Sequence, residues 1–171
     1  MTSENPFAQF RNECQLVLTD ALKKTIPEVR VEPLPLSKPP NLEFGQLSSS
    51  LCFELAKKLN QKPADLATHL VKSINKKKFR LIESCTVVGG YLNFHVNFPK
   101  FSSLTFESIL KLGSSYGFVK TKQPLKIIVE HTSVNPLHPI PIGQARNPRL
   151  GDAIDRILRH RGHAVAIHYY I

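Results

Sequence analysis

The stretch from Lys126 to Ile171 constrains the fold of this chain most, because it changes its hydrophobic period in a fixed order. It opens with a β-branched run, Ile127-Ile128-Val129-Glu130, followed by a loop from His131 to Pro141. An amphipathic helix is expected to begin around Gly143 and to end at Gly162, with a second strand after it. This strand–helix–strand order is typical of a parallel sheet in which the N-terminus of the helix can face a phosphate group.

The predicted helix carries both an apolar face and charged pairs. Its apolar face consists of Leu150, Ala153, Ile154, Ile157 and Leu158. Asp152 with Arg156, and Asp155 with Arg159, are i,i+4 pairs that we expect on the solvent side. Pro148 would fall in the second turn. There it would remove a backbone hydrogen bond at a cost of up to about 3 kcal/mol unless the helix starts later or kinks.

Four helices are predicted in the residues that precede this stretch. The segment from Pro6 to Lys24 repeats apolar residues at nearly helical spacing. Ser48 or Ser49 is expected to cap a second helix, and Pro63 is well placed as the first residue of a third. A fourth helix is expected from Pro99 to Leu112.

Antiparallel strands are predicted between these helices. Residues 81–88 and 91–98 are expected to form a β-hairpin, because Gly89-Gly90 accepts the positive φ angles of a tight turn. Residues 29–32 alternate like a short edge strand, and the proline-rich segment from Pro33 to Pro40 predicts a surface loop. Residues 1–124 therefore predict an α+β domain of helices packed on a small antiparallel sheet, and residues 125–171 predict the first βαβ unit of a Rossmann-type α/β domain.

Charge and cysteine content narrow the class of partner and compartment. The formal net charge is +10, which favours a polyanionic partner such as nucleic acid, although a plain soluble surface remains an alternative. The three cysteines are widely spaced among apolar neighbours, so we expect reduced core thiols rather than a disulfide framework or a zinc ribbon. No run approaches the roughly 20 apolar residues of a membrane span. These features predict a cytoplasmic protein with no membrane partner and no metal site.

Several short sequence segments resemble those of the arginine–tRNA ligases, which are class I aminoacyl-tRNA synthetases. The archaeal and eukaryotic-type members of that family are the most similar. Matching segments lie in the last part of the chain, at Val129 to Pro136, Ile142 to Asn147 and Leu150 to Asp152, and the run from Glu130 to Asn135 is the most specific of them. Further segments that resemble the family lie upstream, at Glu43-Phe44-Gly45, Leu55 to Leu59 and Gly89 to Phe94. The resemblance implies an N-terminal additional domain followed by only the start of a catalytic domain.

The resemblance also implies where ATP and arginine would bind. The family's His-Ile-Gly-His signature corresponds to Pro141-Ile142-Gly143-Gln144, so these residues are the expected ATP site and Gly143 and Gln144 the expected catalytic positions. Glu130, Ser133 and Asn135 match positions that hold or adjoin the arginine substrate. The full enzyme would use ATP as a substrate, together with Mg²⁺. Pro141 has no N–H donor and Gln144 cannot carry a charge, so this copy of the signature is altered. His138 offers a shifted signature as a less favoured alternative.

The tRNA site is expected on the hairpin. In the resembling family a Tyr-x-Asn pattern on this strand grips the D-loop corner of the tRNA, and Tyr91 and Asn93 match it. Strand alternation places Tyr91, Asn93 and His95 on one face. A basic cluster lies beside the hairpin and is expected to contact phosphates; it consists of Lys76, Lys77, Lys78 and Arg80. Tyr91 as an ordinary edge residue remains the alternative.

Two functions follow from this resemblance. The first is the N-terminal portion of an arginine–tRNA ligase, which as an isolated chain would be inactive. The second is a non-catalytic RNA-binding protein derived from such a ligase, which the altered signature favours. An interaction domain without an RNA role is the third reading.

Overall fold

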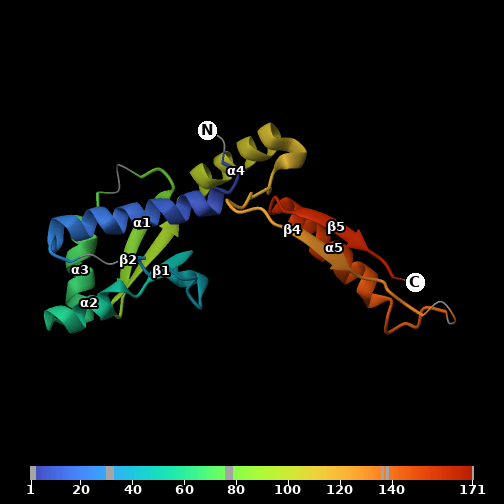
Figure 1. Ribbon diagram of the computed structural model, residues 1–171. Helices are drawn as coiled ribbons and strands as arrows, with labels where there is room; N and C mark the ends of the chain where they lie inside the picture. The colour runs from blue at the N-terminus through green and yellow to red at the C-terminus, as the bar shows by residue number, and fades with distance from the viewer. Residues whose placement is uncertain (1–2, 30–32, 76–78, 136, 138, 171) are drawn as a thin grey trace. The chain divides into compact units, whose positions relative to one another are not determined.

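The computed structural model describes residues 3–29, 33–75, 79–135, 137 and 139–170. These residues form two compact units, residues 1–111 and residues 112–171 (Figure 1). The predicted boundary between residues 124 and 125 lies within the second unit, and the assignment of a separate function to each side of it stays a prediction.

The first unit contains four α-helices, which largely match the predicted ones. They are α1 (Pro6–Thr25), α2 (Leu51–Leu59), α3 (Pro63–Ser73) and α4 (Phe98–Leu112). Pro6 and Pro63 occupy first-turn positions, where a missing N–H costs nothing because those amides have no partner within the helix. The Asn5 side chain caps α1 by accepting a hydrogen bond from the Ala8 amide at 2.9 Å.

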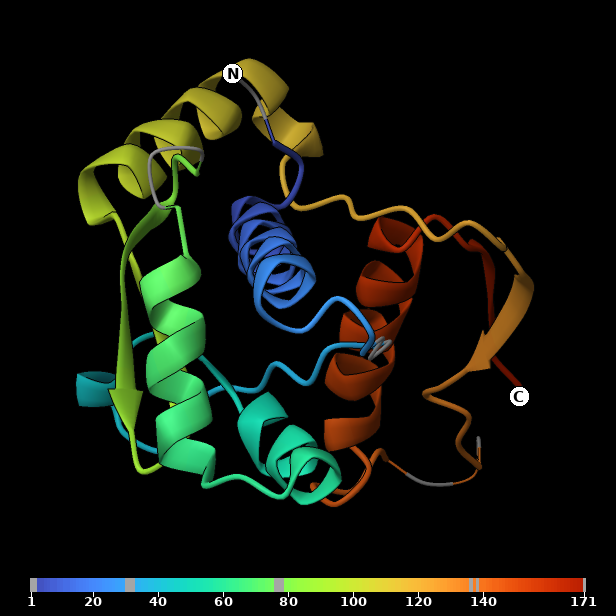
Figure 2. The same cartoon turned by 90° about the vertical axis from the view of Figure 1, so that its left-hand side faces the viewer.

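The sheet of the first unit is antiparallel with strand order β1-β3-β2. Its strands are β1 (Leu47–Ser49), β2 (Ile82–Val88) and β3 (Tyr91–Val96). Gly89 and Gly90 turn the hairpin with φ angles of 57° and 96°, which confirms the predicted turn. Helices α1 and α3 lie on one face of this sheet (Figure 2). Leu92, Phe94 and Val96 point to that face and are buried, with exposed fractions of 5% or less.

Two predictions for the first unit need comment. Ser48 and Ser49 do not cap the second helix, because both lie in β1 and Ser50 occupies the N-cap position. Ser49 Oγ accepts a long hydrogen bond from the Leu51 amide, at 3.4 Å. The edge strand predicted over residues 29–32 falls largely outside the described residues.

The hydrophobic core lies entirely in the first unit. It joins buried side chains of all four helices and the three strands, from Phe10 to Leu104. Cys14, Cys52 and Cys85 are buried in it, as expected of core thiols. Burial raises the pKa of Cys52 to about 11, so this thiol stays protonated and unreactive near neutral pH.

The second unit contains the predicted βαβ order. Strand β4 (Lys126–Glu130) pairs in parallel with β5 (Ala164–His168), and α5 (Arg146–His160) connects them. Gly162 follows the helix at a φ of 83°, and its amide donates to the Arg159 carbonyl at 2.9 Å. With the α+β unit before it, this is the expected start of a Rossmann-type fold.

The connecting helix begins later than predicted. Residues 142–145 form turns, and α5 starts at Arg146. This start places Pro148 in the first turn, where its missing N–H breaks no hydrogen bond and its ring meets no helical carbonyl. Gly143 and Gln144 therefore do not form the N-terminus of a helix, contrary to the sequence expectation.

The prediction of which α5 residues face solvent is also wrong in part. Asp155 is only 6% exposed, while Leu150, Ile154 and Ile157 are 41–63% exposed. Arg159 explains this orientation, because it donates to Asp155 Oδ1 at 2.7 Å and to the Val165 carbonyl of β5 at 2.9 Å. The Asp152–Arg156 pair lies in solvent as expected.

Candidate functional site

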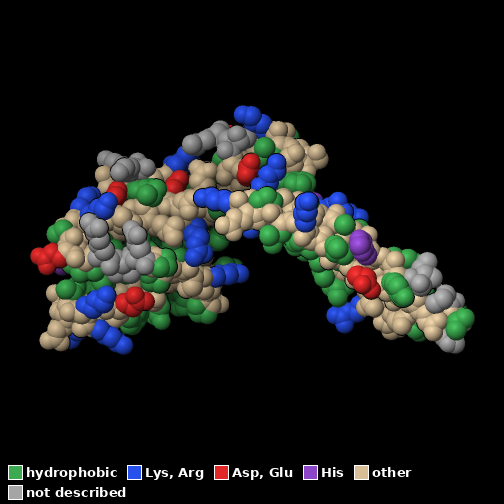
Figure 3. Space-filling view, viewed as in Figure 1, with side chains coloured by type: hydrophobic (Ala, Val, Ile, Leu, Met, Phe, Trp, Pro, Cys, Tyr) green, Lys and Arg blue, Asp and Glu red, His purple; other side chains and the backbone are tan. Residues whose placement is uncertain are grey.

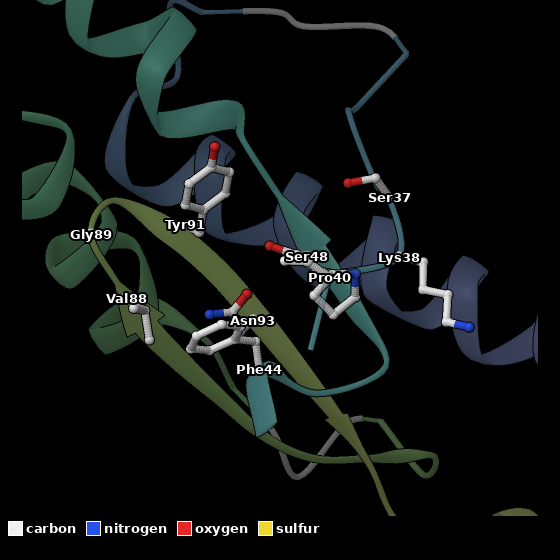
Figure 4. Close-up of a pocket in the computed structure, with 10 residues that line it drawn as sticks. Ser37, Lys38, Pro40, Phe44, Ser48, Val88, Gly89, Tyr91 and Asn93 are labelled. Atoms are coloured by element: carbon white, nitrogen blue, oxygen red, sulfur yellow. The ribbon is translucent and has the colours of Figure 1, made fainter. Parts of the chain in front are cut away.

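A pocket opens on the face of the first sheet opposite its core. It has a volume of about 460 Å³, and its walls come from three separated segments (Figure 4). Its lining residues are Ser37, Lys38, Pro39, Pro40, Phe44, Ser48, Val88, Gly89, Tyr91 and Asn93. Both predicted tRNA-binding residues of β3 therefore belong to one cavity.

The proline-rich segment forms one wall because it is tied to the edge of the sheet. Ser37 and Ser48 exchange two backbone hydrogen bonds of 2.9 and 2.8 Å, which fix the chain beside β1. Pro39 and Pro40 follow at once and limit the motion of that wall. The predicted surface loop is thus part of a pocket.

Phe44 also lines the pocket and is held by two local features. It closes a short 3₁₀ helix, η1 (Leu42–Phe44), capped by the side chain of Asn41. Gly45 then turns at a φ of 87°, and a Cβ there would lie 2.4 Å from the Phe94 carbonyl oxygen. Only glycine allows this close approach to β3, which explains the glycine of the Glu43-Phe44-Gly45 segment.

The floor of the pocket is polar. Ser48 and Asn93 are directly opposite each other in the β1–β3 pair, so their side chains share this face. They are 7% and 2% exposed, respectively. Within the described residues, neither side chain makes a hydrogen bond, and neither is among the fully buried polar atoms that lack a partner, so their polar atoms open into the pocket.

Tyr91 stands at the mouth of the pocket. Its side chain is 46% exposed, and its ring lies 4.7 Å from the ring of Phe53 at an angle of 55°. Gly90 is packed so closely that a Cβ there would meet Pro63 at 2.9 Å and Phe53 at 3.1 Å. The hairpin turn therefore packs tightly against α2 and α3, which fixes the backbone position of Tyr91.

The predicted basic cluster is only partly described. Arg80 is exposed, and Lys76, Lys77 and Lys78 lie outside the described residues. On the face shown in Figure 3, lysine and arginine side chains are spread over the first unit among acidic ones. Lys38 is the basic residue that lines the pocket itself.

The predicted arginine-binding residues lie at the carboxyl end of β4. Ser133 Oγ donates to Glu130 Oε1 at 2.9 Å and accepts from the Tyr170 amide at 3.2 Å. Glu130 and Ser133 line a smaller pocket of about 250 Å³, whereas Asn135 does not line it and instead accepts from the Leu137 amide at 3.0 Å. The structure thus brings two of the three residues together.

His131 and Gly151 set the shape of this smaller pocket. A Cβ on Gly151 would lie 2.2 Å from Cγ of His131, so the histidine packs directly on the helix backbone. His131 Nε2 is buried without a hydrogen-bond partner among the residues described. Thr132 adopts a φ of 66°, and its hydroxyl lies 2.6 Å from His131 Nδ1.

The residues of the altered signature are all exposed. Ile142 is 94% exposed. The amides of Gln144 and Ala145 already donate to the Pro141 carbonyl, at 2.9 and 3.2 Å. The turn therefore offers few free donors to an anion, and His138 lies outside the described residues.

Metal and membrane features were searched over the described part of the chain. No group of three or more histidine, cysteine or acidic residues is placed to hold a metal ion there. No helix in that part is long and apolar enough to cross a membrane.

Sequence reasoning missed Ser48, Phe44 and the segment 37–40 as pocket residues. A three-residue strand shows no alternation that could separate Ser48 from a helix cap. The positions of Phe44 and the proline segment depend on contacts with β3 and β1, which lie far away in the sequence.

Comparisons with known proteins show the family to which the chain belongs. A family model for the arginyl tRNA synthetase N terminal domain matches residues 12–96. The arginine–tRNA ligase of Methanocaldococcus jannaschii is 41% identical over 136 residues, 80% of this chain and 24% of that protein. The Thermus thermophilus arginyl-tRNA synthetase structure superposes with a TM-score of 0.50 at 31% identity, over 92% of this chain and 24% of the other.

A more distant structure has the same fold. The arginyl-tRNA synthetase of Plasmodium falciparum gives a TM-score of 0.64 at 16% identity, over 94% of this chain and 30% of the other. The chain thus spans about a quarter of the length of the curated relatives it matches.

Proposed function

Because the chain belongs to the arginyl-tRNA synthetase family and corresponds to an N-terminal portion of such a ligase, we propose that its first unit binds tRNA through one unstacked D-loop base. The observation that carries this proposal is the pocket lined by both the half-exposed ring of Tyr91 and the side-chain amide of Asn93, two residues apart on one face of β3. The Tyr91 ring is a surface on which a base can stack. The Asn93 amide is a hydrogen-bonding group without a partner among the described residues.

The chemistry of this pocket suits a base better than a phosphate or a peptide. Single-stranded RNA loops are recognised by stacking unpaired bases on aromatic rings and by hydrogen bonds to the base edges. A side-chain amide offers two donors and one acceptor, so it can pair with a base edge that alternates acceptor and donor. Lys38 at the wall adds a positive charge near an incoming backbone.

Replacing Tyr91 by alanine should weaken binding of matched tRNA by roughly 1–3 kcal/mol, the range for stacking of one base on an aromatic ring. Tyr91→Phe should retain most of the affinity, because the ring is kept. Titration of tRNA and of tRNA with altered D-loop bases, at two salt concentrations, measures the effect.

Phe106→Ala is a matched control for this titration, since Phe106 is 65% exposed on α4 and does not line the pocket. It should leave tRNA affinity unchanged. Loss of affinity in Tyr91→Ala that is equal for all tRNAs, or no loss at all, would show that Tyr91 is an ordinary edge residue.

Neutralising Lys76, Lys77 and Lys78 should weaken binding to all RNAs alike. Each lost phosphate contact lowers the salt slope of the binding constant by roughly 0.7–0.9, so the triple glutamine variant should lose about 2–3 in slope. This prediction depends on sequence charge, because the three lysines lie outside the described residues. An unchanged slope would exclude them as phosphate contacts.

For the second unit we propose the beginning of an arginine and ATP site. Glu130 at the end of a parallel strand can pair with a guanidinium group, and Ser133 orients its carboxylate. In the full ligase, ATP would arrive as a substrate with Mg²⁺. The turn at Pro141–Gln144 does not fit a triphosphate well, because its described amides are partly used and both histidines are absent.

That mismatch favours a second function for the chain, a non-catalytic RNA-binding protein derived from the ligase. The supporting observation is the replacement of both signature histidines by Pro141 and Gln144. Under this second function the tRNA pocket is kept and arginine activation is absent, and the two functions share the first unit.

A further inference from the structure

We infer that Ser48 is a second base-reading residue of the Tyr91 pocket, and that its hydroxyl and the Asn93 amide together bind the polar edge of one unstacked base. This inference rests on the tRNA binding proposed above and adds to it a specificity-determining residue. It starts from the register of the sheet, in which Ser48 and Asn93 are direct cross-strand partners.

The two side chains share one face at close range. Directly opposite residues of an antiparallel pair have Cβ atoms about 4.5–5.5 Å apart. That spacing is close enough for a hydroxyl and an amide to contact neighbouring polar atoms of a single base. Figure 4 shows both side chains at the cavity, with Phe44 and Pro40 beside them.

The polar atoms of this pair are free to meet a ligand. Both residues are more than nine-tenths buried, and in the described part of the chain their side chains make no hydrogen bond. Their polar atoms are not among the fully buried ones that lack a partner, so they reach the solvent of the pocket and can exchange water for a polar atom of a ligand. Ser49, the next residue, differs because its hydroxyl accepts from the Leu51 amide.

The surroundings select a flat, partly apolar ligand. Phe44, Pro40 and Val88 supply apolar walls around the polar floor. A base presents two apolar faces and one polar edge, which matches an apolar wall pair over a polar floor. A hydroxyl can donate once and accept twice, so Ser48 can adapt to either kind of atom beside the group that Asn93 contacts.

The test combines stability with binding. Ser48→Ala should bind matched tRNA about 3- to 10-fold more weakly, the effect of one lost neutral hydrogen bond. It should not lower the Tm, because in the free protein the hydroxyl has no partner to lose. A structural role for Ser48 would instead lower the Tm.

Thr86→Val is the matched control, because Thr86 pairs with Asn93 from the other side on the same face of the sheet. Its hydroxyl lies near His95 Nε2, and it does not line the pocket. Its substitution should leave tRNA affinity unchanged.

A set of tRNAs with single abasic sites in the D-loop identifies the base. At one abasic site, both Tyr91→Ala and Ser48→Ala should lose their effect on affinity, which supports the inference. If the affinity loss of Tyr91→Ala depends on that base but Ser48→Ala binds tRNA as tightly as the original chain, the inference about Ser48 is wrong and the proposed tRNA site stands. If neither variant depends on any D-loop base, the proposed tRNA site itself fails, and the inference fails with it.

Discussion

Arginine-dependent exchange of pyrophosphate into ATP should stay at the level of the blank for this chain, even with tRNA present. Pro141 has no N–H, Gln144 has no charge, and the Gln144 and Ala145 amides already donate to the Pro141 carbonyl. Stabilising charge at a phosphate needs preorganised donors, and the loss of one donor typically costs about 10²–10³ in rate. Loss of two independent donors would cost roughly 10⁴–10⁶ on the same basis.

The arginine–tRNA ligase of Methanocaldococcus jannaschii is the reference enzyme for this assay. Introducing proline and glutamine at its two corresponding signature positions should reduce its exchange rate by at least about 10²-fold. That comparison attributes the effect to the two residues rather than to the length of the chain. Exchange by the present chain that rises with its concentration and disappears in Glu130→Gln would contradict the prediction.

Much of the fold could be predicted from local chemistry. Pro6 and Pro63 fix helix starts by themselves, and Gly89-Gly90 fixes the hairpin turn, because each effect depends on a few neighbouring residues. The parallel order of β4 and β5 followed from the strand–helix–strand pattern. These features need no knowledge of distant contacts.

The departures arise where a distant contact outweighs the local pattern. Ser48 resembles a helix cap in the sequence, but its backbone pairs with Ser37 and with Asn93, so it lies in a strand. Asp155 resembles a surface residue, but Arg159 links it to the Val165 carbonyl and keeps it buried.

The start of α5 could have been read from the sequence with stricter use of one residue. A proline is acceptable in the first turn of a helix and costly in the second. Pro148 therefore moves the helix start to Arg146 and leaves Gly143 and Gln144 in turns. The expectation that helix N-terminal amides at these residues would face a phosphate depended on that earlier start, whereas the ATP site itself was implied by the resemblance.

Backbone amides of Ile154 and Ile157 in α5 should exchange with deuterium at least about 100-fold faster than those of Leu55 and Leu92. A difference of this size needs only about 3 kcal/mol between the opening free energies, well within the range from local fraying to global unfolding. Leu55 and Leu92 are fully buried, and Leu92 lies in the central strand of its sheet. Hydrogen exchange followed by NMR or mass spectrometry measures all four positions in one sample.

The reason for this difference is the lack of an apolar core in the second unit. Its only buried residues among those described are Gly151 and Asp155, and Ile128 on β4 is 63% exposed. A parallel strand normally has both faces covered, so β4 lacks the packing that would protect it and the helix above it. Ile157→Ser should leave exchange in α5 nearly unchanged, because little buried area is lost, whereas Leu70→Ala should speed exchange in the first unit by removing a fully buried side chain. Equal protection of the two units, or strong destabilisation of α5 by Ile157→Ser, would show that the exposed face of α5 is covered in solution.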